Sequence, residues 1–405
     1  MHPSNRLRGT KSRHLDGKRV VLGVAGSIGA VEAVKIAHEL QRHGADVLPV
    51  MTKAATQILG PDALEYATGH KPLLHLTGQG EHVKWCGKGG EADLLLIAPA
   101  TANTITKIAL GIDDNALTSC ATVAVGAGLP VVLAPAMHEV MGEHPAVKQR
   151  LRDLERMGVT VIAPRVEEEK AKLADAETIV DLVCNRIAKG ALAGRNVLVI
   201  SGSTAEPLDP VRVVTNRSSG RLGVEIAREA FRRGARVDLW NAWGAVELPR
   251  ALSVRRFQTV DDLLRLLDKY DVSRYDLILV PAALSDFAPK PSKEKIPTDA
   301  GGIDARLEPL PKVLPRLRED APDAFIVGFK AESDPKKLVE RARERLASHK
   351  ANLFTGNLSD AFGATETTMW IIARSGKPRE IKGHKRVLAA KILDEVGKRL
   401  ERGER

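Results

Sequence analysis

The feature that most constrains the fold of this chain is a sequence phrase that occurs twice. Residues 18–50 show an apolar strand, a glycine-containing turn, an amphipathic helix and a second strand, and residues 195–239 repeat that order. A later phrase is repeated as well, because the apolar runs at 92–100 and 275–283 both lead into a Pro-Ala turn. Alternating strands and helices of this kind form doubly wound parallel sheets. The sequence therefore predicts an α/β protein with two Rossmann-like domains.

The boundary between these domains is expected in the segment 189–194, whose small residues are typical of a linker. We place the first domain at residues 1–189 and the second at residues 190–405. The chain of 405 residues is long enough for two or three domains. The alternative is one large domain whose halves look alike because parallel α/β sheets share such phrases.

Composition limits the classes of function. The chain has 61 Lys and Arg against 51 Asp and Glu, a formal charge of +10 with much of the excess near the two ends. That balance suits anionic substrates or nucleic acid, yet aromatic residues form only 3% of the chain, which argues against base stacking. Three cysteines are too few for a disulfide framework, so we expect a cytoplasmic protein. We expect no signal peptide and no membrane span.

A long polar segment, residues 201–223, separates the apolar strand 196–200 from the amphipathic helix 224–231. An ordinary strand-to-helix turn needs only a few residues. This one contains Arg212 and Arg217 and ends in Ser218, Ser219 and Gly220 at a helix N-terminus, where backbone amides favour anions. The segment predicts a site for a phosphorylated ligand.

The first half has weaker polar signals after its strands. Residues 26–28 follow the first strand, but they lack the G-x-G-x-x-G spacing and the Walker lysine, so a simple tight turn is the alternative. Thr52 follows the second strand as a further hydroxyl. Residues 99–104 place two hydroxyls and an amide before a helix expected to begin near Ile105, and N-capping explains only one of the three.

Two histidines in the first half are candidates for chemistry. His82 precedes the apolar run at 92–100, and His138 follows the strand 131–134. A single histidine is as readily structural as catalytic, so these residues alone leave both interpretations open.

The motifs together resemble a known family. The first half resembles flavin-dependent cysteine decarboxylases, with Gly-Ser-Ile, a histidine, Pro-Ala-Thr-Ala-Asn-Thr and Pro-Ala-Met in order. The second half resembles phosphopantothenate–cysteine ligases through E-P-L-D-P-V-R, T-N-R-S-S-G, A-A-L-S-D-F, E-K-I and V-G-F-K-A-E. Nearly the whole chain looks like an archaeal-type variant of the bifunctional phosphopantothenoylcysteine decarboxylase/phosphopantothenate–cysteine ligases of coenzyme A biosynthesis. The resemblance implies a flavodoxin-like decarboxylase domain followed by a ligase domain.

For the first domain the resemblance implies FMN-dependent oxidation of a cysteine moiety, loss of CO2 and return of the hydride. His82 matches the base of the oxidative step. His138 stands where the family often has an asparagine that holds the substrate carboxylate, and its ring can still donate a hydrogen bond. The matching positions for FMN are Gly26, Ser27, Ile28, Thr52, Thr101, Ala102, Asn103 and Thr104.

One departure concerns the proton donor of the reductive step. The commoner form of the family has a flap cysteine, whereas the corresponding stretch here, residues 167–175, has none. Lys170 and Lys172 are candidates for that donor. The alternative is that this charged run is simply a solvated surface.

For the second domain the resemblance implies an acyl-cytidylate made from 4′-phosphopantothenate and CTP with Mg²⁺ or Mn²⁺, from which cysteine displaces CMP. Asn216 matches the residue that stabilises the acyl-nucleotide, Arg212 one needed in the second step, and Lys295 a loop lysine that reaches the triphosphate. Further matching positions are Ser218, Ser219, Gly220, Ala282, Ala283, Asp286, Phe329, Lys330, Arg345 and Lys350. Asp286 as a helix N-cap and Lys295 as a plain surface lysine are the structural alternatives.

The resemblance also implies homo-oligomers, with trimeric flavin domains and dimeric ligase domains forming a dodecamer. Its partners would be 4′-phosphopantothenate, cysteine and CTP, with no nucleic acid and no membrane. Two other functions stay open at this point. One is a nucleic-acid-binding protein that uses its basic ends. The other is a ligase whose first domain binds flavin without catalysis.

Overall fold

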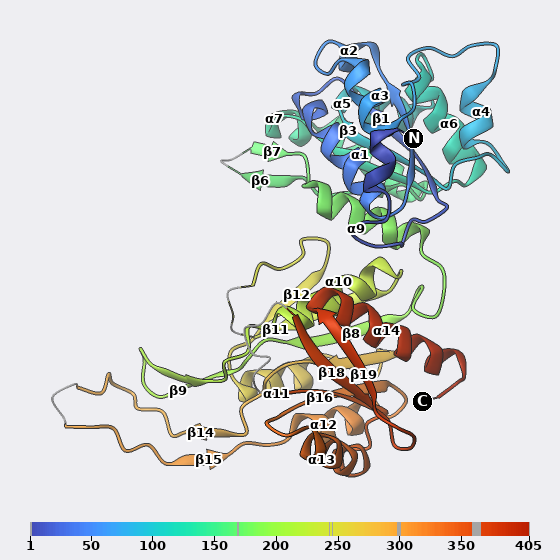
Figure 1. The fold of residues 1–405 in the computed structure, drawn as a ribbon. Helices are drawn as coiled ribbons and strands as arrows, with labels where there is room; N and C mark the ends of the chain where they lie inside the picture. The colour runs from blue at the N-terminus through green and yellow to red at the C-terminus, as the bar shows by residue number, and fades with distance from the viewer. Residues whose placement is uncertain are drawn as a thin grey trace. The chain divides into compact units, whose positions relative to one another are not determined.

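The structure is a computed structural model that describes residues 2–167, 170–242, 244, 246–297, 301–358 and 366–404. It divides into two compact units, Met1–Ala188 and Lys189–Arg405 (Figure 1). The segment 189–194, where we expect the domain boundary, belongs to the second unit. Leu192 is buried in a hydrophobic cluster of the second unit, and Arg195 Nε donates to the carbonyl of Ala191 at 2.6 Å. Apolar burial of one leucine is enough to attach this short segment to the second unit.

The first unit is a parallel sheet in the order β2-β1-β3-β4-β5. Its strands are β1 (Arg19–Val24), β2 (Asp46–Met51), β3 (Leu94–Ala100), β4 (Val131–Pro135) and β5 (Thr160–Val161), with a separate hairpin of β6 (Arg165–Glu167) and β7 (Lys170–Lys172). Its helices are η1 (Pro3–Leu7), η2 (Ile28–Glu32), α1 (Ala33–Arg42), α2 (Lys53–Thr56), α3 (Pro61–Thr68), α4 (Glu81–Cys86), α5 (Ala102–Leu110), α6 (Ala116–Ala127), α7 (Glu139–Glu143), α8 (Pro145–Arg156) and α9 (Ala176–Ile187).

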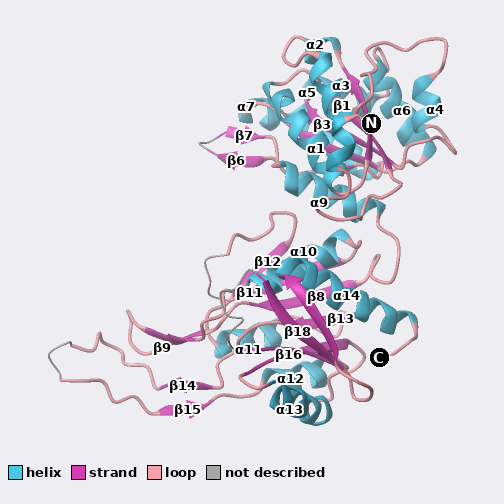
Figure 2. Ribbon diagram, in the orientation of Figure 1, coloured by secondary structure: helices cyan, strands magenta, loops and turns pink. Residues whose placement is uncertain are grey.

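Helices cover both faces of this sheet, so its central strands are apolar throughout (Figure 2). Along β1, Val20 and Leu22 pack in the cluster that contains α1, α3 and α9, whereas Val21 packs in the cluster that contains α5, α6 and α8. This alternation is the period of two that a strand imposes. The cysteines Cys86, Cys120 and Cys184 are buried and free.

The second unit has an eight-stranded sheet in the order β12-β11-β8-β13-β16-β17-β18-β19, parallel from β12 to β17. The strands β18 and β19 continue it antiparallel. The bounds are β8 (Asn196–Ser201), β11 (Arg236–Asn241), β12 (Ser253–Arg256), β13 (Leu277–Val280), β16 (Phe325–Glu332), β17 (Leu353–Leu358), β18 (Glu366–Ile372) and β19 (Arg379–His384).

Five helices flank this second sheet among the residues that the structure describes. They are α10 (Arg221–Arg232), α11 (Val260–Lys269), α12 (Val313–Asp320), α13 (Pro335–Ser348) and α14 (Lys385–Glu401). Val197 and Val199 of β8 pack in the cluster of α10 and α14, and Leu198 and Ile200 pack in the cluster of α11, α12 and α13. This architecture confirms the predicted α/β fold class.

The long polar segment 201–223 has regular structure within it. It contains the antiparallel pair β9 (Ala205–Pro207) and β10 (Val213–Thr215), and a second ribbon is formed by β14 (Phe287–Pro289) and β15 (Leu307–Pro309). In Figure 1 both ribbons extend from the same side of the second unit. The pairing satisfies backbone groups that a long loop would leave to water.

The basic N-terminal segment is tied to the first unit by ion pairs. Arg8 and Arg19 pair with Asp46 at 3.0 and 3.1 Å, and Lys18 pairs with Asp93 at 2.8 Å. These cations therefore have carboxylate partners within the fold. Among the described residues, none of the helices is long and apolar enough to cross a membrane.

Candidate functional site

The residues predicted to bind flavin follow three adjacent strands. β1, β2 and β3 end at Val24, Met51 and Ala100, and the sheet order places β1 between the other two. Residues 26–28, Thr52 and 101–104 come directly after these ends. In an open α/β sheet the crevice at such a switch point is where ligands bind.

The hydroxyl groups of this edge first serve the helices that they begin. Thr52 caps α2, accepting from the amide of Ala55 at 3.2 Å, and Thr101 caps α5, accepting from Thr104 at 3.2 Å. Helix α5 therefore begins at Ala102, not near Ile105, because the cap and not the apolar periodicity fixes its start.

At this edge one side chain remains for a ligand, and one turn is fixed by packing. The exposed amide of Asn103 has no hydrogen-bond partner among the residues that the structure describes. The backbone at Gly26 approaches α2 so closely that a Cβ there would lie 2.3 Å from Ala54 Cβ. A glycine is therefore required at residue 26 by the packing of this turn against α2.

His138 lies at the same edge, one segment beyond β4. It is exposed and precedes α7 without a side-chain capping bond. The predicted flap corresponds to the hairpin β6–β7. Residues 168–169 lie outside the described part of the chain, and so does the side chain of Lys170. Lys172 is half-buried at the end of β7.

His82 is not brought to this edge within one chain. It lies on α4, which packs against α6, and Figure 1 shows α4 apart from α7. The Nδ1 atom of His82 is buried and has no hydrogen-bond partner in the described structure. A ring nitrogen left without a partner is available to a ligand or to a second copy of the chain.

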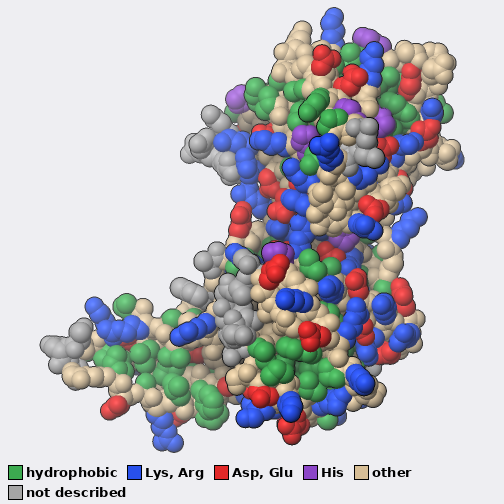
Figure 3. Space-filling model, in the orientation of Figure 1, with side chains coloured by type: hydrophobic (Ala, Val, Ile, Leu, Met, Phe, Trp, Pro, Cys, Tyr) green, Lys and Arg blue, Asp and Glu red, His purple; other side chains and the backbone are tan. Residues whose placement is uncertain are grey.

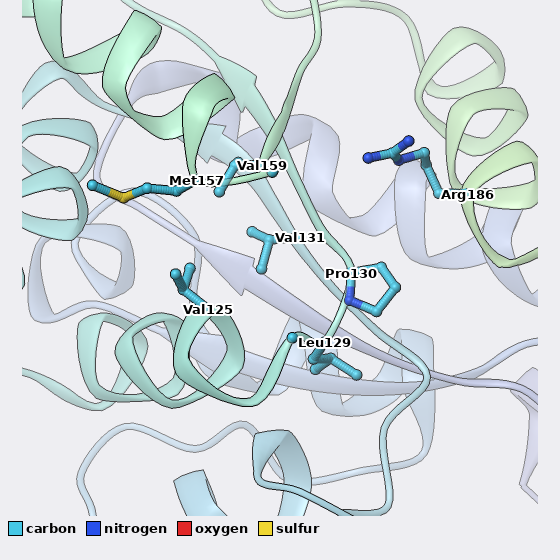
Figure 4. Close-up of a pocket in the computed structure, with 9 residues that line it drawn as sticks. Val125, Leu129, Pro130, Val131, Met157, Val159 and Arg186 are labelled. Carbon is cyan, nitrogen blue, oxygen red and sulfur yellow. The ribbon is translucent and has the colours of Figure 1, made fainter.

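A small cavity of about 250 Å³ in the first unit is not the flavin site (Figure 4). It lies where β4 begins, at the opposite edge of the sheet from residues 26–28. Its lining residues are Val125, Gly128, Leu129, Pro130, Val131, Met157, Gly158, Val159 and Arg186. It contains none of the predicted residues.

The second unit holds a larger cavity, of about 790 Å³, at the carboxyl ends of β13 and β16. It gathers segments that are far apart in the sequence. The predicted residues that line it are Asn216, Ser218, Ser219, Gly220, Ala282, Ala283, Asp286, Phe329, Lys330 and Arg345. Arg212, Lys295 and Lys350 do not line it.

Hydrogen bonds from two serine side chains fix the Ser-Ser-Gly turn that lines this cavity. Ser203 Oγ donates to the carbonyl of Ser218 at 3.1 Å, and Ser201 Oγ donates to that of Gly220 at 3.0 Å. Gly220 has a φ of +73°, and a Cβ there would lie 2.9 Å from Gly202 Cα. These contacts turn the carbonyls toward the protein. The amides of Gly220 and Arg221 donate to Ser218 Oγ and Ser219 Oγ at 3.4 and 3.5 Å, long contacts that an anion at the start of α10 could replace.

Polar groups on the opposite wall are also positioned. Asn216 Nδ2 donates to the carbonyl of Ala283 at 3.1 Å, which leaves its Oδ1 for a ligand. Asp286 does not cap a helix, because β14 follows it, so that alternative is wrong. Burial opposes its ionisation, but its pKa is lowered because the hydrogen bond from Lys312 and the charges of Arg345 and Lys330 outweigh burial.

Arg212 and the Lys295 segment meet outside the cavity, at Asp209. The side chain of Asp209 has no exposed surface and accepts from the Arg212 guanidinium at 2.7 Å and from the Ile296 amide at 3.2 Å. Arg212 also donates to the carbonyl of Ile296 at 3.0 Å. The base of the β9–β10 ribbon and the loop of Lys295 are therefore joined by one carboxylate, while the Lys295 side chain itself is exposed.

Sequence reasoning missed His349, which lines the cavity beside Arg345. Burial and the charges of Arg345 and Lys312 lower its pKa, and its Nδ1 is buried without a partner in the described structure. The spacing of four residues from Arg345 was the available signal, because such residues share a helix face. Lys350 follows α13, and its carbonyl accepts from Arg318.

No group of three or more His, Cys, Asp or Glu side chains that could hold a metal ion occurs in the described ranges. A divalent cation in the larger cavity would therefore need ligands from a bound phosphate as well as from Asp286.

Two family models match the chain. One described as Flavoprotein covers residues 8–188, and one described as DNA/pantothenate metabolism flavoprotein C-terminal domain covers residues 192–400. Similar proteins include the coenzyme A biosynthesis bifunctional protein CoaBC of Thermococcus kodakarensis, which is 41% identical over 407 residues, 99% of this chain and 100% of that protein. CoaBC of Methanocaldococcus jannaschii is 36% identical, covering 98% of both chains. CoaBC of Bacillus subtilis is 31% identical over 91% of this chain and 93% of its own.

Solved structures are similar to each half separately. The C-terminal domain of a CoaBC protein is 27% identical, with a TM-score of 0.45 over 53% of this chain and 99% of its own. A PPC decarboxylase mutant bound to pantothenoylaminoethenethiol is 29% identical, with a TM-score of 0.34 over 41% of this chain and 96% of its own.

Proposed function

The chain belongs to the family of bifunctional coenzyme A biosynthesis proteins, CoaBC, and from that membership we propose which residues perform each of its two steps. It is a phosphopantothenate–cysteine ligase and a phosphopantothenoylcysteine decarboxylase in one chain. We assign ligation to the second unit and decarboxylation to the first. The cavity of about 790 Å³, which gathers most of the matching ligase residues, is the observation that carries the proposal.

In ligation, we propose that CTP activates the carboxylate of 4′-phosphopantothenate, releasing pyrophosphate, and that the amine of cysteine then displaces CMP. The amides of the Ser218–Gly220 turn hold phosphate, and Asn216 stabilises the acyl-nucleotide through its free Oδ1 and N–H. Asp286 would help to hold a Mg²⁺ or Mn²⁺ ion, which would neutralise negative charge on the phosphates. Lys295 reaches the triphosphate from the loop that Asp209 holds.

In decarboxylation, bound FMN supplies reversible oxidation of the cysteine moiety, which makes loss of CO2 easy. The groups that fit FMN are the free amide of Asn103 and the turns capped by Thr52 and Thr101, together with the turn at residues 26–28 that packs on α2. His138 holds the substrate carboxylate as a hydrogen-bond donor, and His82 is the base of the oxidative step.

Both sites are completed between copies of the chain in this proposal. His82 and His138 lie on separate parts of the first unit. Apolar side chains stand exposed on the two ribbons of the second unit, with Val211 68% and Phe287 51% exposed. Figure 3 shows hydrophobic side chains gathered in this region. A second copy would remove them from water, which supports ligase dimers and, with trimers of the first unit, a dodecamer.

Mass analysis of one reaction tests the proposal. The full chain is incubated with FMN, 4′-phosphopantothenate, cysteine, CTP and magnesium, and in a control ATP replaces CTP. Appearance of 4′-phosphopantetheine and CMP supports both assignments. Absence of any product with either nucleotide would refute them.

A ligase with a non-catalytic flavin-binding unit is the second candidate, favoured by the absence of cysteine from residues 167–175. Accumulation of 4′-phosphopantothenoylcysteine without loss of CO2 would establish it. Release of CO2 that requires the first unit's FMN would exclude it.

A further inference from the structure

The cations that line the larger cavity fall into two groups. Lys312 pairs with Asp286, and Lys330 pairs with Glu332 at 3.1 Å. In contrast, Arg217, Arg221, Arg345 and Lys385 line the same cavity, and the described structure gives none of them an ion pair with a carboxylate. Arg345 acts on Asp286 through its charge, whereas Arg221 and Lys385 act on each other. Paired cations are partly neutralised before a substrate arrives, whereas unpaired ones retain their full attraction for an anion.

Lys385 and Arg221 come from opposite ends of the second unit's sequence and meet through packing. Arg221 is the first residue of α10 and Lys385 is the first residue of α14, and these two helices pack against each other. Partial burial and the charge of Arg221 lower the pKa of Lys385. Glu366, the acidic residue of β18, lies 2.9 Å from His384 Nε2.

This arrangement costs free energy without a ligand. Two like charges in a partly desolvated cavity repel each other, and the N-cap residues Gly220 and His384 make no side-chain capping bond. The Arg221 amide has only a long contact with Ser219 Oγ, at 3.5 Å. A polyanion seated between them would remove both costs. Phosphate fits best, because it carries two charges and several acceptor oxygens.

We propose that Lys385, together with Arg221, binds a phosphate group of a ligase substrate and so sets the affinity for it. This inference rests on the proposed ligase function of the second unit. The phosphate belongs to the 4′-phosphomonoester of the pantothenate substrate or to the nucleotide triphosphate. Both present the same chemistry to a lysine and an arginine, and the kinetic arms below separate them.

Initial rates of ligation by the full chain with Lys385→Gln give the test. Lys398→Gln is the matched control, because it removes the same charge from an exposed position near the other end of α14. The KM values for CTP, 4′-phosphopantothenate and pantothenate without its phosphate are measured together with kcat. We expect Lys385→Gln to raise one KM by about 10- to 100-fold, the loss of one charge-assisted contact. Lys385→Arg, which keeps the charge, should stay within about threefold of wild type.

The pattern of KM values assigns the phosphate. A rise for 4′-phosphopantothenate with no change for pantothenate assigns the phosphomonoester, and a rise for CTP alone assigns the triphosphate. Equal constants for the Lys385→Gln and Lys398→Gln chains would overturn the proposal. So would a fall in kcat with every KM unchanged.

A second measurement does not depend on turnover. Thermal stabilisation of the full chain by inorganic phosphate and pyrophosphate should be smaller for Lys385→Gln than for Lys398→Gln. If the wild-type chain fails to ligate, the proposed function fails, but this comparison still decides whether Lys385 binds phosphate. Equal stabilisation of the two variants would refute that binding.

Discussion

Replacing Arg318 by methionine tests how the edge opposite the ligase cavity is held together. Arg318 extends from α12 and donates to the carbonyls of Pro322 at 2.7 Å, Ala324 at 2.9 Å and Lys350 at 3.0 Å, and to Asn352 Oδ1 at 2.7 Å. These acceptors lie at the starts of β16 and β17. The other ends of these two strands carry residues that line the cavity. The Arg318 guanidinium therefore fixes the positions of two strands that form the ligase site.

The expected loss in the free energy of unfolding depends on which hydrogen bonds each acceptor still receives after the substitution. Asn352 Oδ1 still accepts from the Ile326 amide at 2.8 Å, and the exposed Pro322 carbonyl turns to water. The carbonyls of Ala324 and Lys350 lose a charged donor. At ~1.5–3 kcal/mol for each such bond, with partial rehydration of the Lys350 carbonyl, we expect a loss of about 3 kcal/mol. For a unit of this size that lowers the unfolding temperature by roughly 6–12 °C.

Calorimetry of the full chain measures this shift. Arg316→Met is the matched control, two residues away on α12, where the side chain forms surface ion pairs with Asp268 and Asp320, both at 2.8 Å. Exposed pairs contribute little, so we expect no resolved shift for it. Equal shifts for the Arg316→Met and Arg318→Met chains would refute the reasoning, since charge alone would then explain both.

Three further outcomes are expected. His82→Asn should abolish CO2 release and leave ligation intact, and equal decarboxylation by this variant and wild type would show that His82 is not the base. Asp209→Asn should speed hydrogen exchange at the Ile296 backbone amide and slow ligation, because the asparagine side chain has one acceptor oxygen and cannot accept from both Arg212 and Ile296 as Asp209 does. Unchanged exchange at Ile296 would show that Asp209 does not hold the Lys295 loop in place. The hydrogen bond from His70 lowers the pKa of Asp46 to about 2, below an unfolded value of ~3.9, so its contribution to stability is present above about pH 4 and lost as the pH falls toward 2. Asp46→Asn should therefore flatten the acid side of the stability profile, and an unchanged profile would contradict this.

Elements buried on both faces could be predicted from the sequence. The runs at 196–200 and 131–134 are apolar without interruption, and each is a central strand. The start of α5 could not be found by the same means, since a threonine cap extends the helix ahead of its first apolar residues. The ribbon β9–β10 was also missed, because three-residue strands show no usable alternation.

The residues that line the cavity could be predicted from the sequence only where several of them lie in one short segment. The Ser-Ser-Gly turn and the Ala282–Asp286 segment are of this kind. His349 and Lys385 each come from a helix full of charged residues, and the sequence does not distinguish the one that faces the cavity. Their roles depend on how α13 and α14 pack, which is a tertiary property.

The hydrophobic clusters carry a genetic consequence. Each of the four is made only of residues from one side of the junction between Ala188 and Lys189. A gene cut at that codon would encode two polypeptides that each keep a complete interior. Fission, fusion or exchange of either half with a foreign counterpart is thus compatible with the interior packing of both halves.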